Sequence, residues 1–179
     1  MKLLRTIALD PSDGFVFDVA AERGDWAVSG AFCFCDCDPL KLTGKERWAF
    51  RGGFLGVRSW GWSTLVQIVD ATQHDRAVLV DLLARQLVDR LGAPDVATAM
   101  AAAEEEVAFA QSLCTHPVGT LVAVHRSAKD GEIREAFRTL QRREDVTHGK
   151  AFAFVDVAEE PQADPDLKLI DLNREPQRP

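Results

Sequence analysis

The sequence has no apolar run that approaches the thickness of a lipid bilayer. Its first segment, MKLLRTIALDPSDG, carries two basic residues, but the apolar run is cut at Asp10 and Pro11, which makes it too short for a secretory signal. Basic residues are also scarce, because 21 Lys and Arg oppose 28 Asp and Glu, for a net charge of -7. This balance disfavours nucleic acid and anionic membranes as partners. We therefore expect a cytoplasmic protein whose thiols stay reduced.

The sequence also lacks the short motifs that mark common enzyme sites. The glycines of RGGFLGVRSWGWSTL (51–65) match neither a phosphate-binding loop nor a dinucleotide fingerprint. The GWST stretch lacks the second glycine of a nucleophile elbow, so Ser63 is not predicted to be a nucleophile. The four histidines show no metal-ligand spacing. No catalytic residue is predicted, and the balance favours a protein that is not an enzyme.

Length and composition predict one domain followed by a tail. At 179 residues, with 46% apolar and 27% charged residues, the chain can bury a sizeable core. We assign residues 1–158 to a single domain. Residues 159–179 hold half of the prolines and are rich in acids, which predicts an extended acidic, proline-rich tail. Within it, LKLIDL (167–172) alternates in a way that suits adding a strand to a sheet edge, its own or that of a protein partner.

The first part of the chain predicts strands and one short helix. The segments LLRTIAL (3–9), FVFDVA (15–20) and WAVSGAFCFC (26–35) predict an antiparallel meander that ends before Pro39. Thr43 and Glu46 have capping-box spacing, which predicts a helix over 44–51. The segments GFLGVRSW (53–60) and WSTLVQIVDA (62–71), broken at Gly61, predict a second hairpin.

Two helices should follow and lie antiparallel, because Gly92 and Pro94 leave only a short connection between them. Thr72 and Asp95 are the predicted caps, and leucines recur through the first helix at positions 79, 83, 87 and 91. The second helix carries a seam of apolar and small residues: Val96, Met100, Ala103, Val107, Ala110 and Cys114. The acidic run 104–106 falls between seam positions and predicts a solvated face.

The last part returns to strands. Residues 120–128, a turn with the Asp130-Gly131 signal, and residues 132–140 predict a hairpin. The period of 132–140 also fits a helix, and the turn signal favours the strand. Residues 150–158 predict a further strand. The fold class is therefore α+β: a largely antiparallel sheet built from two meanders and a central hairpin, with an antiparallel helix pair and a short helix packed on one face.

Three of the four cysteines fall in GAFCFCDCDPL (30–40). On a strand they would lie roughly 7 Å apart on one face, which is too far for neighbouring thiolates to share a zinc ion. A turn at 36–38 would bring Cys35 and Cys37 together, and Cys114 with His116 would complete a Cys3His zinc site. Packing of the cysteines in the core is the favoured interpretation, and a zinc site and a reactive thiol remain alternatives.

Tryptophans gather in the glycine-rich stretch. Trp60 and Trp62 are predicted on one strand face, with Trp48 near them on the short helix and Arg58 available for an anionic group. One interpretation is a core or subunit-contact cluster, and the other is one wall of an apolar ligand pocket.

Four stretches, DWAVSGAF, GFLGVRSWGWSTLVQIV, SLCTHPVGTLVAVHR and GEIREAFRTL, together resemble a family of small uncharacterised bacterial proteins. The resemblance runs over most of residues 1–157. It implies a standalone bacterial domain of unknown function and carries over no catalytic residues.

Two functional hypotheses follow. The leading one is a non-catalytic accessory or protein-interaction domain that forms a homo-oligomer through the tryptophan surface and residues 167–172. The alternative is a small-molecule- or metal-binding protein, an enzyme included, that uses the tryptophan and arginine pocket or the cysteine and histidine set.

Overall fold

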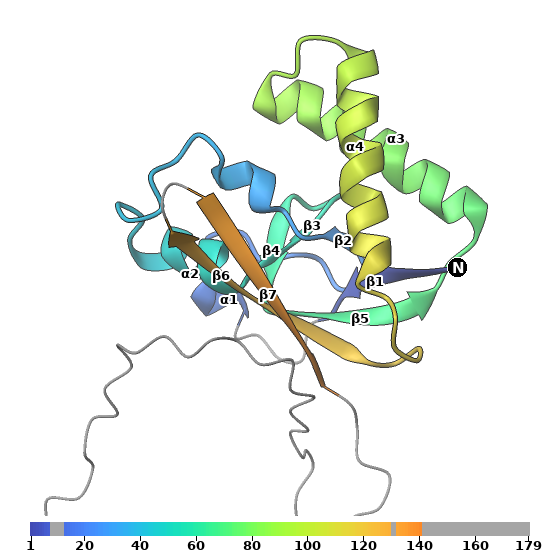
Figure 1. Cartoon of the computed structure of the whole chain (residues 1–179), viewed down its shortest axis with the longest axis horizontal. Coiled ribbons are helices and arrows are strands. Elements are labelled where there is room, and N and C mark those ends of the chain that lie inside the picture. Colours follow the sequence, from blue (N-terminus) through green and yellow to red (C-terminus); the bar gives the residue numbers. More distant parts are fainter. Residues whose placement is uncertain (8–12, 130–131, 141–179) are drawn as a thin grey trace, which may run out of the picture.

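The structure, a computed structural model, describes residues 1–7, 13–129 and 132–140. Within them, strands form one antiparallel, curled sheet in the order β4-β3-β2-β1-β5-β6-β7 (Figure 1). The predicted α+β class is confirmed. The strands are β1 (Lys2–Thr6), β2 (Trp26–Val28), β3 (Phe54–Gly56), β4 (Gly61–Ser63), β5 (Leu65–Asp70), β6 (Leu121–Lys129) and β7 (Glu132–Leu140). The predicted strand 150–158, the boundary at 158 and the segment 167–172 lie outside the described residues.

The helices are α1 (Asp13–Val16), α2 (Gly44–Gly52), α3 (Gln73–Leu91) and α4 (Val96–Ser112), with a 3-10 turn, η1, at Ala31–Phe34. The two long helices begin at the predicted caps. Thr72 Oγ1 accepts from the Asp75 amide at 3.0 Å, and Asp75 Oδ2 accepts from the Thr72 amide at 2.8 Å. Asp95 Oδ1 accepts from the Thr98 amide at 2.8 Å and starts α4.

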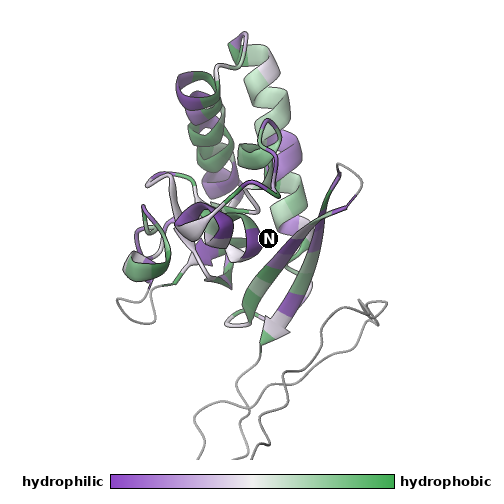
Figure 2. Ribbon diagram, turned by 90° about the vertical axis from the view of Figure 1, so that its left-hand side faces the viewer, coloured by the Kyte–Doolittle hydropathy of each residue, from purple (hydrophilic) through white to green (hydrophobic). Residues whose placement is uncertain are grey.

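The helix pair α3 and α4 packs antiparallel above the sheet (Figure 1). Charged and strongly apolar residues alternate along α3, whereas small apolar residues dominate α4 (Figure 2). The predicted leucine stripe is buried at Leu79, Leu83 and Leu87 and ends at Leu91, the last residue of α3, which is exposed. No helix in the described part of the chain is both long and apolar enough to span a membrane.

The predicted N-terminal meander is wrong in two places. Gly30 adopts φ 78, which only glycine tolerates readily, and turns the chain so that β2 stops at Val28 and the FCFC stretch forms η1 instead of a strand. Residues 13–16 form α1, and the rest of the predicted strand 15–20 contributes only an isolated bridge from Ala20 to Trp62. As a result β1 pairs with β2 and β5, and it lies at the centre of the sheet.

The other predictions are mostly confirmed. Helix α2 forms, but Thr43 makes no side-chain cap hydrogen bond, so the predicted capping box is absent there. The second hairpin forms between β3 and β4. Its predicted return strand 62–71 is divided into β4 and β5, which lie at different places in the sheet. Residues 132–140 are a strand, paired with β6 along its whole length around the Asp130-Gly131 signal.

Candidate functional site

An arginine lies buried on the inner face of the β6–β7 hairpin. Arg126 follows Val122 and Val124 at every second position of β6, and like them it is buried, with only 1% of its surface exposed. Its register partner on β7 is Glu135, and Arg126 Nε donates to Glu135 Oε1 at 2.7 Å. A buried guanidinium needs such a partner, because an unpaired buried charge is strongly unfavourable.

The rest of the guanidinium of Arg126 binds backbone carbonyls at the end of α2. Nη1 donates to the oxygens of Phe50 at 3.1 Å and Gly53 at 2.7 Å. Nη2 donates to the carbonyl oxygen of Ser29 and, at 3.1 Å, to its hydroxyl oxygen. Carbonyls at a helix C-terminus lack helical partners and carry partial negative charge. Arg126 therefore caps α2 and joins it to the end of β2.

A second carboxyl group approaches this arginine from α4. Glu106 Oε1 accepts from the Gly30 amide at 3.2 Å, which holds the loop before η1 against the helix. Burial is the main cause that raises the pKa of Glu106, and the nearby Glu135 carboxylate acts in the same direction. We call Arg126, Glu135 and Glu106 the Arg126 cluster. When both carboxyl groups are ionised, two negative charges share one guanidinium, so the cluster carries one negative charge in excess.

Glu106 also lines an apolar groove of about 370 Å³ between η1, α3 and α4. The lining residues are Phe32, Leu87, Ala102, Glu105, Glu106 and Phe109. Phe109 is 38% exposed and meets Phe137 of β7 edge-on at 5.7 Å. Phe32 packs against Trp60 with 6.3 Å between ring centres. The groove thus combines aromatic walls with a half-buried carboxyl group, an arrangement typical of small-molecule sites.

The structure separates the predicted tryptophan pocket into individual contacts. Trp60 packs on Phe32 and lies 5.4 Å from the guanidinium of Arg90, whereas Trp62 packs on Phe34 at 5.2 Å. Trp48 is 61% exposed on α2.

The predicted arginine is also engaged elsewhere. Arg58 Nη2 pairs with Glu22 at 2.9 Å on an exposed surface. Neither groove described in this section is lined by Trp48, Arg58, Trp60 or Trp62. The arginine that lies beside Trp60 is Arg90 of α3, and no motif in the sequence predicted this contact.

The predicted zinc ligands are likewise placed apart. Cys35 and Cys37 are exposed beside η1, whereas Cys114 is buried and its thiol donates to the Ala110 carbonyl at 3.4 Å. The carbonyl of His116 accepts from Lys2 Nζ at 2.7 Å. Across residues 1–7, 13–129 and 132–140, no three Cys, His, Asp or Glu side chains are placed to hold a metal ion.

The half-buried thiol of Cys33 and the buried thiol of Cys114 are poor nucleophiles. Burial raises the pKa of Cys33 to about 12 and that of Cys114 to about 11. Both thiols are therefore protonated at neutral pH, and they react slowly because the thiolate is the reactive form. For these two cysteines, the structure agrees with the core-packing interpretation.

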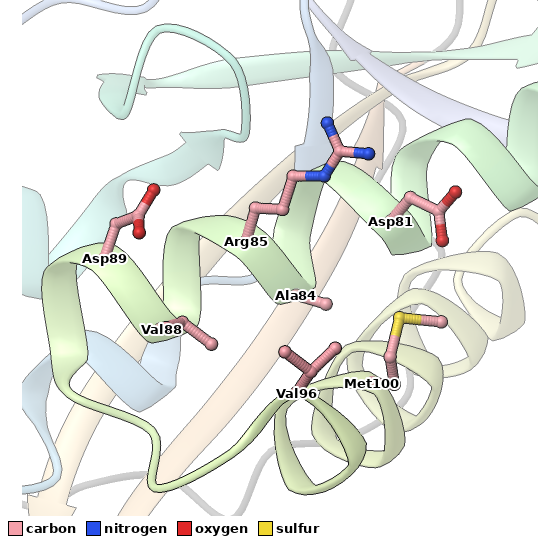
Figure 3. A pocket seen from close by; sticks show the side chains of 7 residues that line it. All are labelled: Asp81, Ala84, Arg85, Val88, Asp89, Val96 and Met100. Carbon is pink, nitrogen blue, oxygen red and sulfur yellow. The ribbon is translucent and has the colours of Figure 1, made fainter.

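A larger groove of about 510 Å³ opens between α3 and α4 near the tip of the helix pair (Figure 3). Its apolar side chains, Ala84, Val88, Val96 and Met100, point toward one another between the helices. The charged side chains of Asp81, Arg85 and Asp89 point away from that seam (Figure 3). Because no polar groups converge there, this groove is explained by helix packing.

The residues of the Arg126 cluster were missed by sequence analysis, although one signal was present. Arg126 continues the inward alternation of Val122 and Val124, and the register of β6 and β7 places it opposite Glu135, as the Asp130-Gly131 signal in the sequence would predict. The prediction of a solvated face for 104–106 is wrong for Glu106, which is half-buried. It is confirmed for Glu105, which is exposed.

Comparison with known proteins gives a family without an assigned role. No curated protein and no solved structure matches the chain. A family of unknown function, DUF6505, matches residues 1–157. This range is the one over which the resemblance was expected. Because the match covers most of its length, the chain belongs to this family of unknown function.

Proposed function

We propose that this protein is a non-catalytic interaction domain that self-associates through the edge of β7 that no described strand covers. The observation that carries the proposal is the position of this strand. All nine residues of β7 pair with β6, and β7 ends the sheet order among the described strands. A strand at the end of a sheet presents unpaired amide and carbonyl groups that can pair with another chain.

The edge is held rigidly, which favours association. The ion pair between Arg126 and Glu135 ties β7 to β6, and the same arginine ties the hairpin to α2. Phe137 of β7 packs against Phe54 at 6.2 Å and against Phe109 of α4. A preorganised strand loses little conformational freedom on binding, so less of the interaction energy is spent on ordering it.

The charges of β7 favour one two-fold register. An antiparallel pair of β7 strands centred on Glu135 places Glu132 opposite Arg138 of the second copy, and this ion pair occurs twice. It also places Ile133 opposite Phe137 of the second copy. The two Glu135 carboxylates face each other in this register, but each already has its own Arg126 as a partner.

The two neighbouring registers, centred on Ala136 and on Arg134, are less favourable. Centring the pair on Ala136 sets Arg134 against Arg138 of the second copy, and centring it on Arg134 sets that arginine against itself. Like charges directly opposite one another destabilise a strand pair. Charge complementarity therefore supports the register centred on Glu135.

Size-exclusion chromatography with light scattering tests the proposal on the full chain. We expect a dimer that Glu132→Arg weakens, because the change sets arginines against each other. Adding Arg138→Glu to that variant should restore the dimer, since the two charges are then exchanged. The matched control is Arg134→Glu, which faces Ala136 of the second copy and should leave the dimer intact. A monomeric wild-type protein, or a dimer indifferent to Glu132→Arg, contradicts the proposal.

Truncation after Ala158 tests the tail. If truncation abolishes the dimer while Glu132→Arg leaves it intact, residues 167–172 and not β7 mediate association.

The proposal also places the protein in the cytoplasm, because Cys35 and Cys37 are exposed and free, and reducing compartments preserve such thiols.

A second candidate function is binding of a small molecule. It is favoured by the groove beside Glu106, where aromatic side chains surround a carboxyl group. Native mass spectrometry before and after denaturation tests this candidate together with the zinc alternative. A retained organic mass supports a ligand, and an excess mass of one zinc per chain supports Cys35, Cys37, Cys114 and His116 as ligands.

A further inference from the structure

We infer that the groove beside Glu106 binds a primary ammonium ion that carries a small aromatic or aliphatic group. The ammonium would meet the Glu106 carboxylate, which lines the groove, and the apolar group would lie between Phe32, Leu87 and Phe109. This inference goes beyond the proposed self-association and does not depend on it, since β7 contributes no lining residue to the groove.

The charge of the cluster calls for a cation. Arg126 is the one described cationic side chain that reaches the cluster, and its donors are used by Glu135, Ser29 and the end of α2. The Glu106 carboxylate accepts a hydrogen bond from the Gly30 amide and feels the charge of Arg126, but it forms no direct ion pair within the residues that the structure places. A half-buried carboxylate that forms no direct ion pair is stabilised further by a proton or by a cationic ligand.

The groove walls suit an organic cation better than a metal ion. Three of the six lining residues, Phe32, Leu87 and Phe109, are large and apolar, and Ala102 adds a further apolar surface. Faces of aromatic rings attract ammonium groups, and the attraction increases when the site is partly shielded from water. The volume of about 370 Å³ falls within the range of small-molecule sites. No three metal-ligating side chains converge in the described part of the chain.

Rim charge adds to the complementarity. Glu105 is exposed and lines the same groove, so a cation approaching from solvent meets a second carboxylate first. Arg90 lies at the neighbouring Trp60 and does not line the groove. An anionic ligand would therefore face two carboxylates with no cationic group among the lining residues.

Glu106 also has a structural role, and the test must separate the two roles. Its hydrogen bond from Gly30 holds the loop before η1 on α4. Glutamine keeps an oxygen acceptor for this bond and removes the charge. The variant Glu106→Gln should therefore keep the fold and lose the affinity for the cation.

Isothermal titration calorimetry on the full chain at neutral pH tests the inference with three probes of one shape: phenethylammonium, phenethyl alcohol and phenylacetate. We expect phenethylammonium to bind at least about tenfold more tightly than the alcohol, because a hydrogen bond between an ammonium and a carboxylate is stronger than one between neutral groups. Phenylacetate should not bind. Glu106→Gln should weaken phenethylammonium by about tenfold and leave the alcohol unchanged, and Glu105→Gln should weaken it only a few-fold.

Three outcomes would overturn the inference. Equal binding of the amine and the alcohol would show that the groove is merely apolar. Unchanged amine affinity in Glu106→Gln, with its circular dichroism spectrum matching the wild type, would remove the carboxylate from the site. Absence of amine binding to the wild-type protein would remove the site altogether. None of these outcomes changes the expected effect of Glu132→Arg on the dimer, so the two proposals fail separately.

Discussion

Replacing Arg126 with methionine should lower the free energy of unfolding by about 3–5 kcal/mol, the usual cost of breaking a buried ion pair from one side. Methionine keeps most of the side-chain volume, so the loss reports on the charge and its hydrogen bonds and not on a cavity. The Glu135 carboxylate would stay half-buried without its partner. The carbonyls of Gly53 and Ser29 would lose their donor as well.

This magnitude is large relative to the whole protein. Each buried polar group left unsatisfied costs about 1–3 kcal/mol. The total cost is smaller than the sum over these groups, because the surrounding side chains relax and water molecules can hydrogen-bond some of the groups. Domains are commonly stable by only about 5–15 kcal/mol. The variant should therefore lose a substantial share of its stability and still fold under mild conditions, with α2 as the first element to loosen.

Urea denaturation followed by circular dichroism measures the effect. The matched control is Arg134→Met on the outer face of β7, where an exposed side chain should matter by no more than about 0.5 kcal/mol. Adding Glu135→Leu to Arg126→Met should recover part of the loss, because an apolar pair can replace a buried ion pair. If Arg126→Met costs no more than Arg134→Met, or if Glu135→Leu only adds to the loss, the reasoning about this cluster is refuted.

Three further predictions concern glycine conformation, thiol reactivity and pH. Gly30→Ala should cost at least about 2 kcal/mol in urea denaturation, because its φ is 78 and its Cβ would lie 2.7 Å from a side-chain carbon of β3. Gly92→Ala, at φ 67 in open space, should cost only about 1 kcal/mol. In a thiol-disulfide exchange assay at mildly alkaline pH, Cys35 and Cys37 should react fast, whereas Cys33 and Cys114 should react slowly; four equal rates would contradict the placement of η1. The pKa of Glu106 is raised in the folded protein, so this group's contribution to stability is complete below the ordinary glutamate pKa and is lost as pH rises through the folded value. Glu106→Gln should flatten that decline in urea denaturation at several pH values. An unchanged pH profile in this variant would contradict the assignment of the decline to Glu106.

The helices and the long hairpin were predictable because local signals decide them. Thr72 and Asp95 cap their helices through side-chain oxygens that reach the next turn. The Asp-Gly signal in the sequence favoured a strand over the helical period of 132–140, and the structure has a strand there. In each case the decisive interaction joins residues that are close in the sequence.

The wrong predictions arose where tertiary contacts or backbone geometry decide the outcome. Alternation in FCFC suits a strand, but the positive φ of Gly30 turns the chain and Glu106 of α4 holds the turn. Thr43 has the right spacing for a capping box and makes no such bond, whereas Arg126, 73 residues beyond Gly53, caps the other end of α2. Spacing rules are local, so they cannot report a cap that is supplied from another part of the sheet.

The central position of β1 has a consequence during synthesis of the chain. As the ribosome extends the protein, β1 can pair with β2 once residues 26–28 have emerged, but its other side waits for β5, where Lys2 meets Asp70. Until then Leu3 and Leu4, which are fully buried in the finished fold, belong to a strand with one open edge. Such edges promote aggregation and are natural targets for chaperones. We therefore expect the emergence of β5 to close the second edge of β1 and to pass the open edge of the growing sheet on to β5, where β6 covers it later.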